Sequence, residues 1–229
     1  MRFGLPVFSG ILIGTSYIPF PPWASLFCFV PLWIFWNRQT RLSEVVLGGL
    51  VCSFVFTLIG FNWVTYTLHE FAHLDWWVAC IGMVIFAVLA HLFVPLAGAL
   101  WFALTGGISR RSWHSRWIMA LLTVLSQASM PTLFDWNFGY TWFASNIPLY
   151  QWAEVVGFSG LSAFTVLSGL MAWAYWEGRR RVRGPRILLT SLLVLVLLNG
   201  GGLWLNGRQD PPDGLLKVLM VQGNIGNSE

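Results

Sequence analysis

The chain has 229 residues, of which 56% are hydrophobic, 17% are aromatic and only 10% are charged. Because soluble domains are typically about 45–50% apolar, this composition excludes an ordinary soluble domain and indicates an integral membrane protein. The net charge of +4 does not indicate a nucleic-acid-binding protein, because excess arginine in a membrane protein usually marks cytoplasmic loops.

Seven apolar stretches approach or reach the roughly 17–25 residues that a transmembrane helix needs. They cover residues 3–20, 22–37, 43–66, 76–104, 117–133, 152–176 and 187–205. The first runs into Phe20-Pro-Pro-Trp23 without a small-residue cleavage site, so we interpret it as a retained helix rather than a signal peptide. The fourth is expected to be one tilted helix, bent at Pro95. The sequence therefore predicts an all-α membrane bundle of about seven helices over residues 1–206.

The basic residues predict how this bundle is oriented. Eleven arginines fall in the N-terminus or in the loops after the second, fourth and sixth spans, whereas only Arg208 and Lys217 fall on the other side. Because cytoplasmic loops carry most of the basic residues, we expect a cytoplasmic N-terminus and a C-terminal segment on the periplasmic or extracellular face. The eleven are Arg2, Arg38, Arg41, Arg110, Arg111, Arg116, Arg179, Arg180, Arg181, Arg183 and Arg186.

The motif His69-Glu70-Phe71-Ala72-His73 follows the third span. If it is helical, its two histidines share a face and could bind zinc, with Glu70 as the general base. No third ligand is evident, however, and a polar interfacial segment at the end of the third span explains the motif better. We therefore expect no metal and no cofactor, and keep an intramembrane zinc protease as the least favoured alternative.

Four polar side chains within or near the spans are further candidates, because polar groups in a bilayer usually face the bundle interior. For Asn62 and Gln127 we favour the simpler role of joining helices by hydrogen bonds. His91 is either a functional group or a satisfied core histidine, and Glu154 lies near the outer end of its span. The three cysteines, Cys28, Cys52 and Cys80, show no spacing typical of a disulfide framework or a metal site. We expect them to be small packing residues.

The loop covering residues 134–151 is rich in aromatic residues and nearly uncharged. This composition is typical of the bilayer interface. The loop is therefore either an anchoring belt or an entrance for a lipid-linked substrate.

The last segment, residues 207–229, has a different composition from the spans. Residues 207–214 are polar and proline-rich, and residues 215–222 form a mainly apolar run that ends at Gly223-Asn224. This pattern predicts a linker and one β-strand. Because a lone strand is unstable, we expect a partner chain or further residues to complete it, or the segment to be disordered.

Three groups of motifs, in this order, resemble the apolipoprotein N-acyltransferases of the bacterial inner membrane. They are Gly60-Phe-Asn-Trp-Val64 with His69-Glu-Phe71, then Phe134-Asp-Trp-Asn-Phe-Gly-Tyr140 with Gly157-Phe-Ser-Gly-Leu161, and finally Lys217-Val-Leu-Met-Val-Gln-Gly-Asn-Ile225. The resemblance covers the whole chain. It implies that residues 1–206 are the transmembrane domain and that residues 207–229 are a linker and the first strand of a nitrilase-like α/β domain.

The resemblance also implies a reaction in which an acyl chain moves from a phospholipid to a cysteine as a thioester and then to the diacylglyceryl-cysteine of a lipoprotein. A glutamate, a lysine and a cysteine of the nitrilase-like domain carry it, so no catalytic residue is expected here and the chain should be inactive without such a half. The expected partners are phospholipid and diacylated lipoprotein, with a nitrilase-like chain as a further partner if the nitrilase-like half is a separate chain. Residues expected to face the substrate are Asn62, Trp63, His69, Glu70, Trp136 and Tyr140.

The chain departs from the family pattern in one place. Leu125-Ser-Gln-Ala-Ser-Met-Pro131 stands where a Glu and an Arg are common, and Asp135 replaces a proline. This departure concerns lipid handling at that face of the bundle. The main alternative from another class of function is a noncatalytic membrane scaffold that binds lipid or lipoprotein.

Overall fold

A computed structural model of the chain describes residues 3–16, 22–106, 112–131, 134, 136–179 and 183–208. Helices make up 81% of these residues, and no strand is found among them. The linker and strand expected at residues 207–229 lie outside them, apart from residues 207 and 208.

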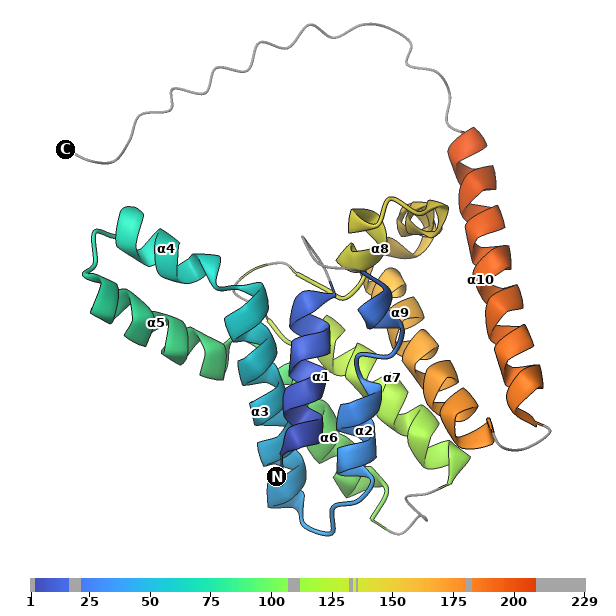
Figure 1. Ribbon diagram of the computed structural model, residues 1–229, viewed down its shortest axis with the longest axis horizontal. Helices are drawn as coiled ribbons and strands as arrows, with labels where there is room; N and C mark the ends of the chain where they lie inside the picture. Colours follow the sequence, from blue (N-terminus) through green and yellow to red (C-terminus); the bar gives the residue numbers. More distant parts are fainter. Residues whose placement is uncertain are drawn as a thin grey trace, which may run out of the picture.

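The N-terminal helices form the centre of the bundle. Helix α1 (Gly4–Thr15) packs along α3 (Leu42–Gly60), and a short 3-10 helix (Pro22–Leu26) leads to α2 (Val30–Trp36) beside them (Figure 1). Large aromatic side chains fill the space between these helices, and Trp33, Trp36 and Phe56 are fully buried. The indole nitrogen of Trp36 donates to the Val45 carbonyl at 2.9 Å, so a polar atom inside this core has its partner.

The third expected span ends earlier than predicted. Helix α3 stops at Gly60 rather than continuing to residue 66, and a separate helix, α4, begins at Trp63 and ends at Glu70. The Asn62 side-chain nitrogen donates to the Ile59 carbonyl at 2.8 Å. A side chain that bonds a nearby carbonyl competes with the helical backbone, and glycine is a poor helix former. The predicted boundary was therefore wrong, because Gly60 and Asn62 favour a turn.

The fourth expected span is broken rather than bent. Helix α5 (Trp76–Leu89) and helix α6 (Phe93–Leu104) are separated by a turn at residues 90–92. The amide of Val94 bonds the His91 carbonyl, but Pro95 has no N–H to continue the α-helical pattern to that carbonyl. Proline therefore accounts for the break, which lies one turn before Pro95 itself.

The C-terminal helices flank this centre. They are α7 (Trp113–Ser129), α8 (Tyr140–Ala144), a 3-10 helix (Pro148–Trp152), α9 (Ala153–Gly178) and α10 (Arg183–Gly207). Helix α9 packs against α7 and α10, and Gly157 near its start is non-helical, with φ 66°. Helix α10 lies at the edge of the bundle, and most of its side chains are exposed.

Four helical segments among the described residues are long and apolar enough to cross a membrane: Leu42–Gly60, Trp76–Leu104, Pro148–Gly178 and Gly184–Gly207. The spans expected at residues 3–20 and 22–37 correspond to shorter apolar helices, Gly4–Thr15 and Trp23–Trp36. The span expected at 117–133 corresponds to α7, which has 17 residues and ends at Ser129. Seven crossings therefore stay a prediction, whereas a multi-span helical fold is confirmed.

An ion pair joins the start of α7 to the end of α9, and both of these helix ends lie toward the bottom of Figure 1. Arg116 Nη1 lies 2.6 Å from Glu177 Oε2, and the guanidinium lies over the Trp173 ring at 4.6 Å. The Arg116 side chain is only 10% exposed, whereas that of Glu177 is 45% exposed. The pair therefore lies at the edge of the protein, with its positive partner largely covered.

We expect Glu177→Gln to lower the midpoint of thermal unfolding in detergent. Removing the carboxylate takes a charged hydrogen-bond acceptor away from a largely covered guanidinium, which typically costs about 1–3 kcal/mol. Glu154→Gln is the matched control, because Glu154 is an exposed acidic residue in the first turn of the same helix. Its loss should cost only about 0.3–1 kcal/mol. Equal effects of the two substitutions would contradict a specific role for the Arg116–Glu177 pair.

Candidate functional site

His91 is the centre of an aromatic cluster at the break between α5 and α6. Its Nδ1 lies 2.8 Å from Thr57 Oγ1 on α3, and Thr57 Oγ1 also lies 2.6 Å from the Ser53 carbonyl. A hydroxyl has one proton, and the carbonyl can only accept. Thr57 therefore donates to Ser53 and accepts from His91 Nδ1–H. This histidine is buried and satisfied, as one of the two interpretations of the sequence predicted.

Aromatic rings surround this histidine on several sides. The centroids of Phe56 and Phe61 lie 4.4 and 4.9 Å from that of His91, and that of Trp136 lies at 5.9 Å. Phe61 contacts Trp136 edge to face at 5.7 Å. Residues of α3, of the α5–α6 turn and of the aromatic loop therefore meet in one cluster.

The middle of the aromatic loop is fixed to α9 by polar contacts. The Gly139 amide lies 2.9 Å from Asn137 Oδ1 and 3.1 Å from Ser162 Oγ. The indole nitrogen of Trp142 donates to Thr165 Oγ1 at 2.8 Å. Phe138, between them, is buried and meets Phe29 edge to face at 4.6 Å. The loop is thus held on one side by hydrogen bonds and on the other by ring packing.

The structure brings together only some of the residues that we expected to face the substrate. Trp63 and Trp136 belong to one aromatic group, because Phe61 contacts both rings and Phe134 contacts Trp63 at 5.1 Å. Asn62 is exposed beside them. Tyr140 instead stacks on Phe158 of α9 at 4.4 Å.

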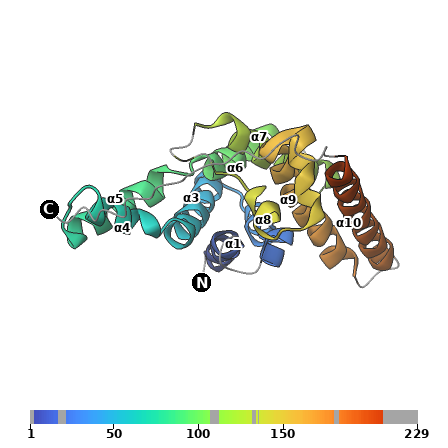
Figure 2. The same ribbon diagram turned by 90° about the horizontal axis from the view of Figure 1, so that it is seen from above.

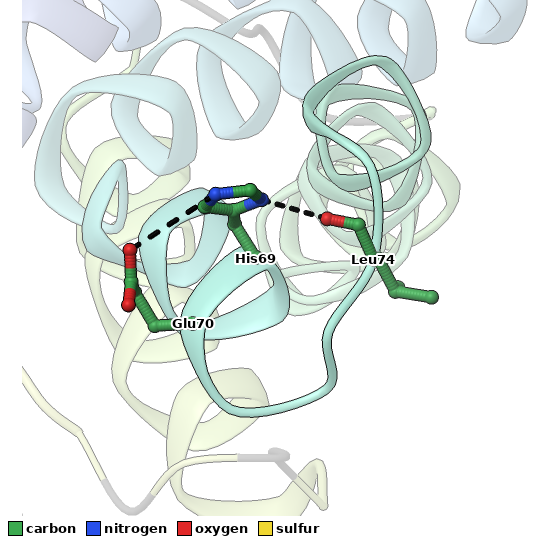
Figure 3. Close-up of polar contacts among 3 residues, drawn as sticks. All are labelled: His69, Glu70 and Leu74. Atoms are coloured by element: carbon green, nitrogen blue, oxygen red, sulfur yellow. Dashed lines mark hydrogen bonds and ion pairs between the residues drawn. The ribbon is translucent and has the colours of Figure 1, made fainter. Parts of the chain in front are cut away.

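His69 and Glu70 are the last two residues of α4 (Figure 3), whereas Trp63 is the first. His69 Nδ1 lies 2.7 Å from the Leu74 carbonyl, and Nε2 lies 4.0 Å from Glu70 Oε1. Because a carbonyl can only accept, His69 Nδ1 carries a proton and donates it to the Leu74 carbonyl. The ring also stacks on Trp76 of α5 at 4.0 Å. His69 therefore joins the end of α4 to the start of α5.

The helical interpretation of the zinc motif was wrong. Helix α4 ends at Glu70, and His73 lies beyond it with a left-handed φ of 53°. His69 and His73 therefore do not share a helical face. Among the described residues no group of three His, Cys, Asp or Glu side chains could hold a metal ion.

The remaining candidates are dispersed. Gln127 is buried in α7, and no hydrogen bond is found for its side-chain nitrogen among the described residues. Glu154 is exposed at the start of α9. Cys28 and Cys52 are buried, as expected of packing residues, but Cys80 is exposed. The packing role predicted for Cys80 was therefore wrong, because α5 places that side chain on the outer surface.

Sequence reasoning missed the partners that hold this region together. Thr57, Ser162 and Thr165 were not singled out, although they bond His91, Gly139 and Trp142. Serine and threonine are common in membrane helices, so their presence in the sequence does not indicate which of them make these contacts.

Comparison with known proteins decides the family of this chain. Residues 9–171 match the family model described as the apolipoprotein N-acyltransferase N-terminal domain. The chain belongs to the apolipoprotein N-acyltransferase family. The match includes the His91 cluster and the aromatic loop, and the resemblance inferred from the motifs is thus confirmed.

Curated relatives agree with this assignment. The chain is 39% identical to the apolipoprotein N-acyltransferase of Bdellovibrio bacteriovorus over 231 residues, which cover 97% of the chain and 41% of that protein. It is 29% identical to apolipoprotein N-acyltransferase 2 of Leptospira interrogans, covering 90% of the chain and 37% of that relative. It is 25% identical to the apolipoprotein N-acyltransferase of a Nostoc strain, and the match covers 94% of the chain and 45% of that relative. The chain thus spans less than half the length of these family members.

The relatives and the apolar helices together identify a multi-pass bacterial membrane protein. Within the family, the His91 cluster and the aromatic loop form the part of this chain where side chains from distant segments meet. We take this region as the candidate site. The hydrogen bonds and ring contacts described above hold the side chains of this region in fixed positions, so the region can form a defined binding surface.

Proposed function

We propose that the chain forms the membrane part of an apolipoprotein N-acyltransferase, which moves an acyl chain from a phospholipid to the N-terminal diacylglyceryl-cysteine of a lipoprotein. The family assignment and the named relatives support this reaction. In this proposal phospholipid and diacylated lipoprotein are the substrates, and the protein lies in the bacterial inner membrane.

The contact between the aromatic loop and the end of α10 carries the proposal. Gln151 Nε2 lies 3.3 Å from Asn206 Oδ1, so the end of the loop lies beside the end of the last helix. A domain that follows α10 would therefore begin next to the aromatic loop. We propose that this loop and the His91 cluster form the membrane-side wall of the site at which lipid substrates meet that domain.

We further propose that the chemistry requires a nitrilase-like domain, either continuous with this chain or on a partner chain. A thioester intermediate needs a cysteine activated by a neighbouring base. Cys28 and Cys52 are buried between helices, and Cys80 lies on the outer surface of α5 among apolar side chains. The glutamate, lysine and cysteine that the family uses would therefore be contributed by the nitrilase-like domain.

An acylation assay tests whether acyl transfer requires both this chain and a nitrilase-like domain. The purified chain is incubated with phospholipid and a diacylated lipopeptide, alone and together with a nitrilase-like domain of the family. We expect triacylated product only when both are present, and the nitrilase-like domain alone is the control. Product from the chain alone would contradict the proposal. No product under any condition would favour a noncatalytic scaffold that binds lipid or lipoprotein.

The proposed orientation places the N-terminus in the cytoplasm and residue 229 in the periplasm. The end of α2, the starts of α3, α7 and α10 and the end of α9 all lie at the lower end of Figure 1, with Arg38, Arg41, Arg116, Arg179 and Arg186 on or beside them. This arrangement supports a cytoplasmic lower end. We expect a reporter inserted between residues 179 and 183 to report the cytoplasm and one fused after residue 229 to report the periplasm. Reporters on the same side would remove one crossing and contradict this orientation.

A further inference from the structure

Helices α4 and α5 form a hairpin that projects sideways from the bundle (Figure 2). We call residues 63–89 the arm. Helix α4 packs against α5, and His69, at the end of α4, stacks on Trp76, at the start of α5. The arm is therefore one unit, joined to the bundle through α3 and α6 at its base.

Helix α5 is apolar on nearly all sides. Its buried residues, Ala79, Met83 and Ala87, recur every fourth position and so lie on one face. The other sides expose large apolar side chains, and the helix contains no charged residue. The exposed ones are Trp76, Trp77, Ile81, Val84, Ile85, Val88 and Leu89. Exposing this much apolar surface to water costs free energy, so we expect α5 to be surrounded by hydrocarbon.

The length of α5 shows that it does not cross a bilayer by itself. Fourteen residues extend about 21 Å at 1.5 Å per residue, whereas the hydrocarbon core is about 30 Å thick. In Figure 1 the arm leaves the upper part of α3 at a steep angle to the bundle helices. A short apolar helix in this position fits within one leaflet.

Helix α4 differs from α5 because its two faces differ. Val64, which is buried, and Leu68, which packs against the core, share one face. Asn62, Tyr66 and Glu70 follow at four-residue intervals on the opposite face. Polar and aromatic side chains together are typical of the headgroup region. In Figure 1, α4 lies above α5, on the side of the upper end of α10.

We propose that the arm lies in one leaflet of the membrane, with α5 among the acyl chains and α4 at the level of the phospholipid headgroups. Its partner is the phospholipid leaflet itself. The chain has no Lys or Arg between Arg41 and Arg110, so the arm binds through apolar area and interfacial aromatic residues rather than through anionic headgroups. The location of the arm in one leaflet does not depend on the proposed orientation of the chain. If the N-terminus is cytoplasmic, as proposed above, this leaflet is the periplasmic one.

Cys80 provides a direct test, because it is exposed on α5 whereas Cys28 and Cys52 are buried. A thiol-reactive environment-sensitive fluorophore should therefore label Cys80 in the unmodified chain. Two matched positions are labelled in a Cys80→Ser background: Tyr66→Cys on the outer face of α4 and Leu193→Cys in the middle of α10. The labelled proteins are placed in phosphatidylcholine vesicles with nitroxides at the headgroup, at a shallow acyl carbon or at a deep acyl carbon, or with aqueous iodide.

We expect the shallow acyl nitroxide to quench the Cys80 label about twofold more strongly than iodide does, since interfacial helices bury their apolar face about 5–10 Å deep. The Tyr66→Cys label should respond most to the headgroup nitroxide and to iodide, and the Leu193→Cys label to the deep nitroxide. Replacing a third of the lipid by phosphatidylglycerol should not change this order.

Two results would overturn the proposal. Equal, strong iodide quenching of the labels at positions 66 and 80 would place the arm in water, and strongest quenching of both by the deep nitroxide would make it a membrane-crossing hairpin. The depth measurement requires no acyl transfer. The proposed enzymatic function can therefore be contradicted while the position of the arm in the leaflet is confirmed, and the position of the arm can be contradicted while the enzymatic function is confirmed.

Discussion

The double substitution Gly10→Val and Gly14→Val should strongly destabilise the helical bundle. A side-chain Cβ at Gly10 would lie 2.7 Å from the Cys52 carbonyl oxygen, and one at Gly14 would lie 2.8 Å from the Ile59 Cβ. Small residues four apart let two membrane helices approach closely, and here they bring α1 against α3. Overfilling a packed contact costs about 1–3 kcal/mol at each site, and the Cys52 backbone carbonyl that faces Gly10 cannot rotate away.

The matched control for this double variant is Gly4→Val. Gly4 begins the same helix, but no atom lies within 4 Å of a Cβ built there. We expect the control to elute as a single species from size-exclusion chromatography and to unfold near the wild-type temperature. The double variant should aggregate, or unfold at a clearly lower temperature. If both behave like the wild type, α1 does not pack on α3 through these glycines.

Long apolar stretches could be located from the sequence, because a continuous run of hydrophobic residues in a membrane protein has few alternatives to a helix. Residues 152–176 and 187–205 fall within helical segments of the structure, and residues 76–104 form α5 and α6 with the turn at residues 90–92 between them. The boundaries were less predictable. The turn at Gly60–Asn62 depends on one side chain that bonds the Ile59 carbonyl, and such local competition does not alter the hydropathy.

The candidate site was predictable in its composition but not in its contacts. The density of aromatic residues between positions 134 and 151 indicated an interfacial or functional loop, and Trp63 and Trp136 do belong to one ring cluster. The bond between Thr57 and His91 joins residues 34 positions apart. It exists because α3 and the α5–α6 turn pack together, and that packing follows from the tertiary fold rather than from a local pattern.

The Gly139→Ala variant should have the largest effect on the candidate site. A Cβ at this position would lie 2.5 Å from the Phe158 carbonyl oxygen and 2.6 Å from the Leu161 Cβ. The backbone φ of Gly139 is −67°, which alanine adopts readily, so the effect is one of space and not of backbone strain. The loop must move away from α9, and both contacts of the Gly139 amide would then be lost or lengthened.

We expect Gly139→Ala to destabilise the protein by about 1–3 kcal/mol from overpacking, with about 0.5–1.5 kcal/mol more for each hydrogen bond lost. Ser162→Ala separates the two causes, because it removes one contact of the Gly139 amide without adding volume. Gly200→Ala is the control, since no atom lies within 4 Å of a Cβ there and alanine favours a helix interior by about 0.5–1 kcal/mol.

Thermal unfolding in detergent measures these differences, and the acylation assay with a nitrilase-like domain measures their consequence. Displacing Phe138 from Phe29 and Phe93, which it contacts edge to face at 4.6 and 5.8 Å, would also shift Trp136 beside His91. Gly139→Ala should therefore reduce product formation more than Glu177→Gln, which acts at the other end of the bundle. Wild-type activity in a folded Gly139→Ala protein would show that the loop does not shape the lipid site, and the proposed membrane-side wall would have to lie elsewhere.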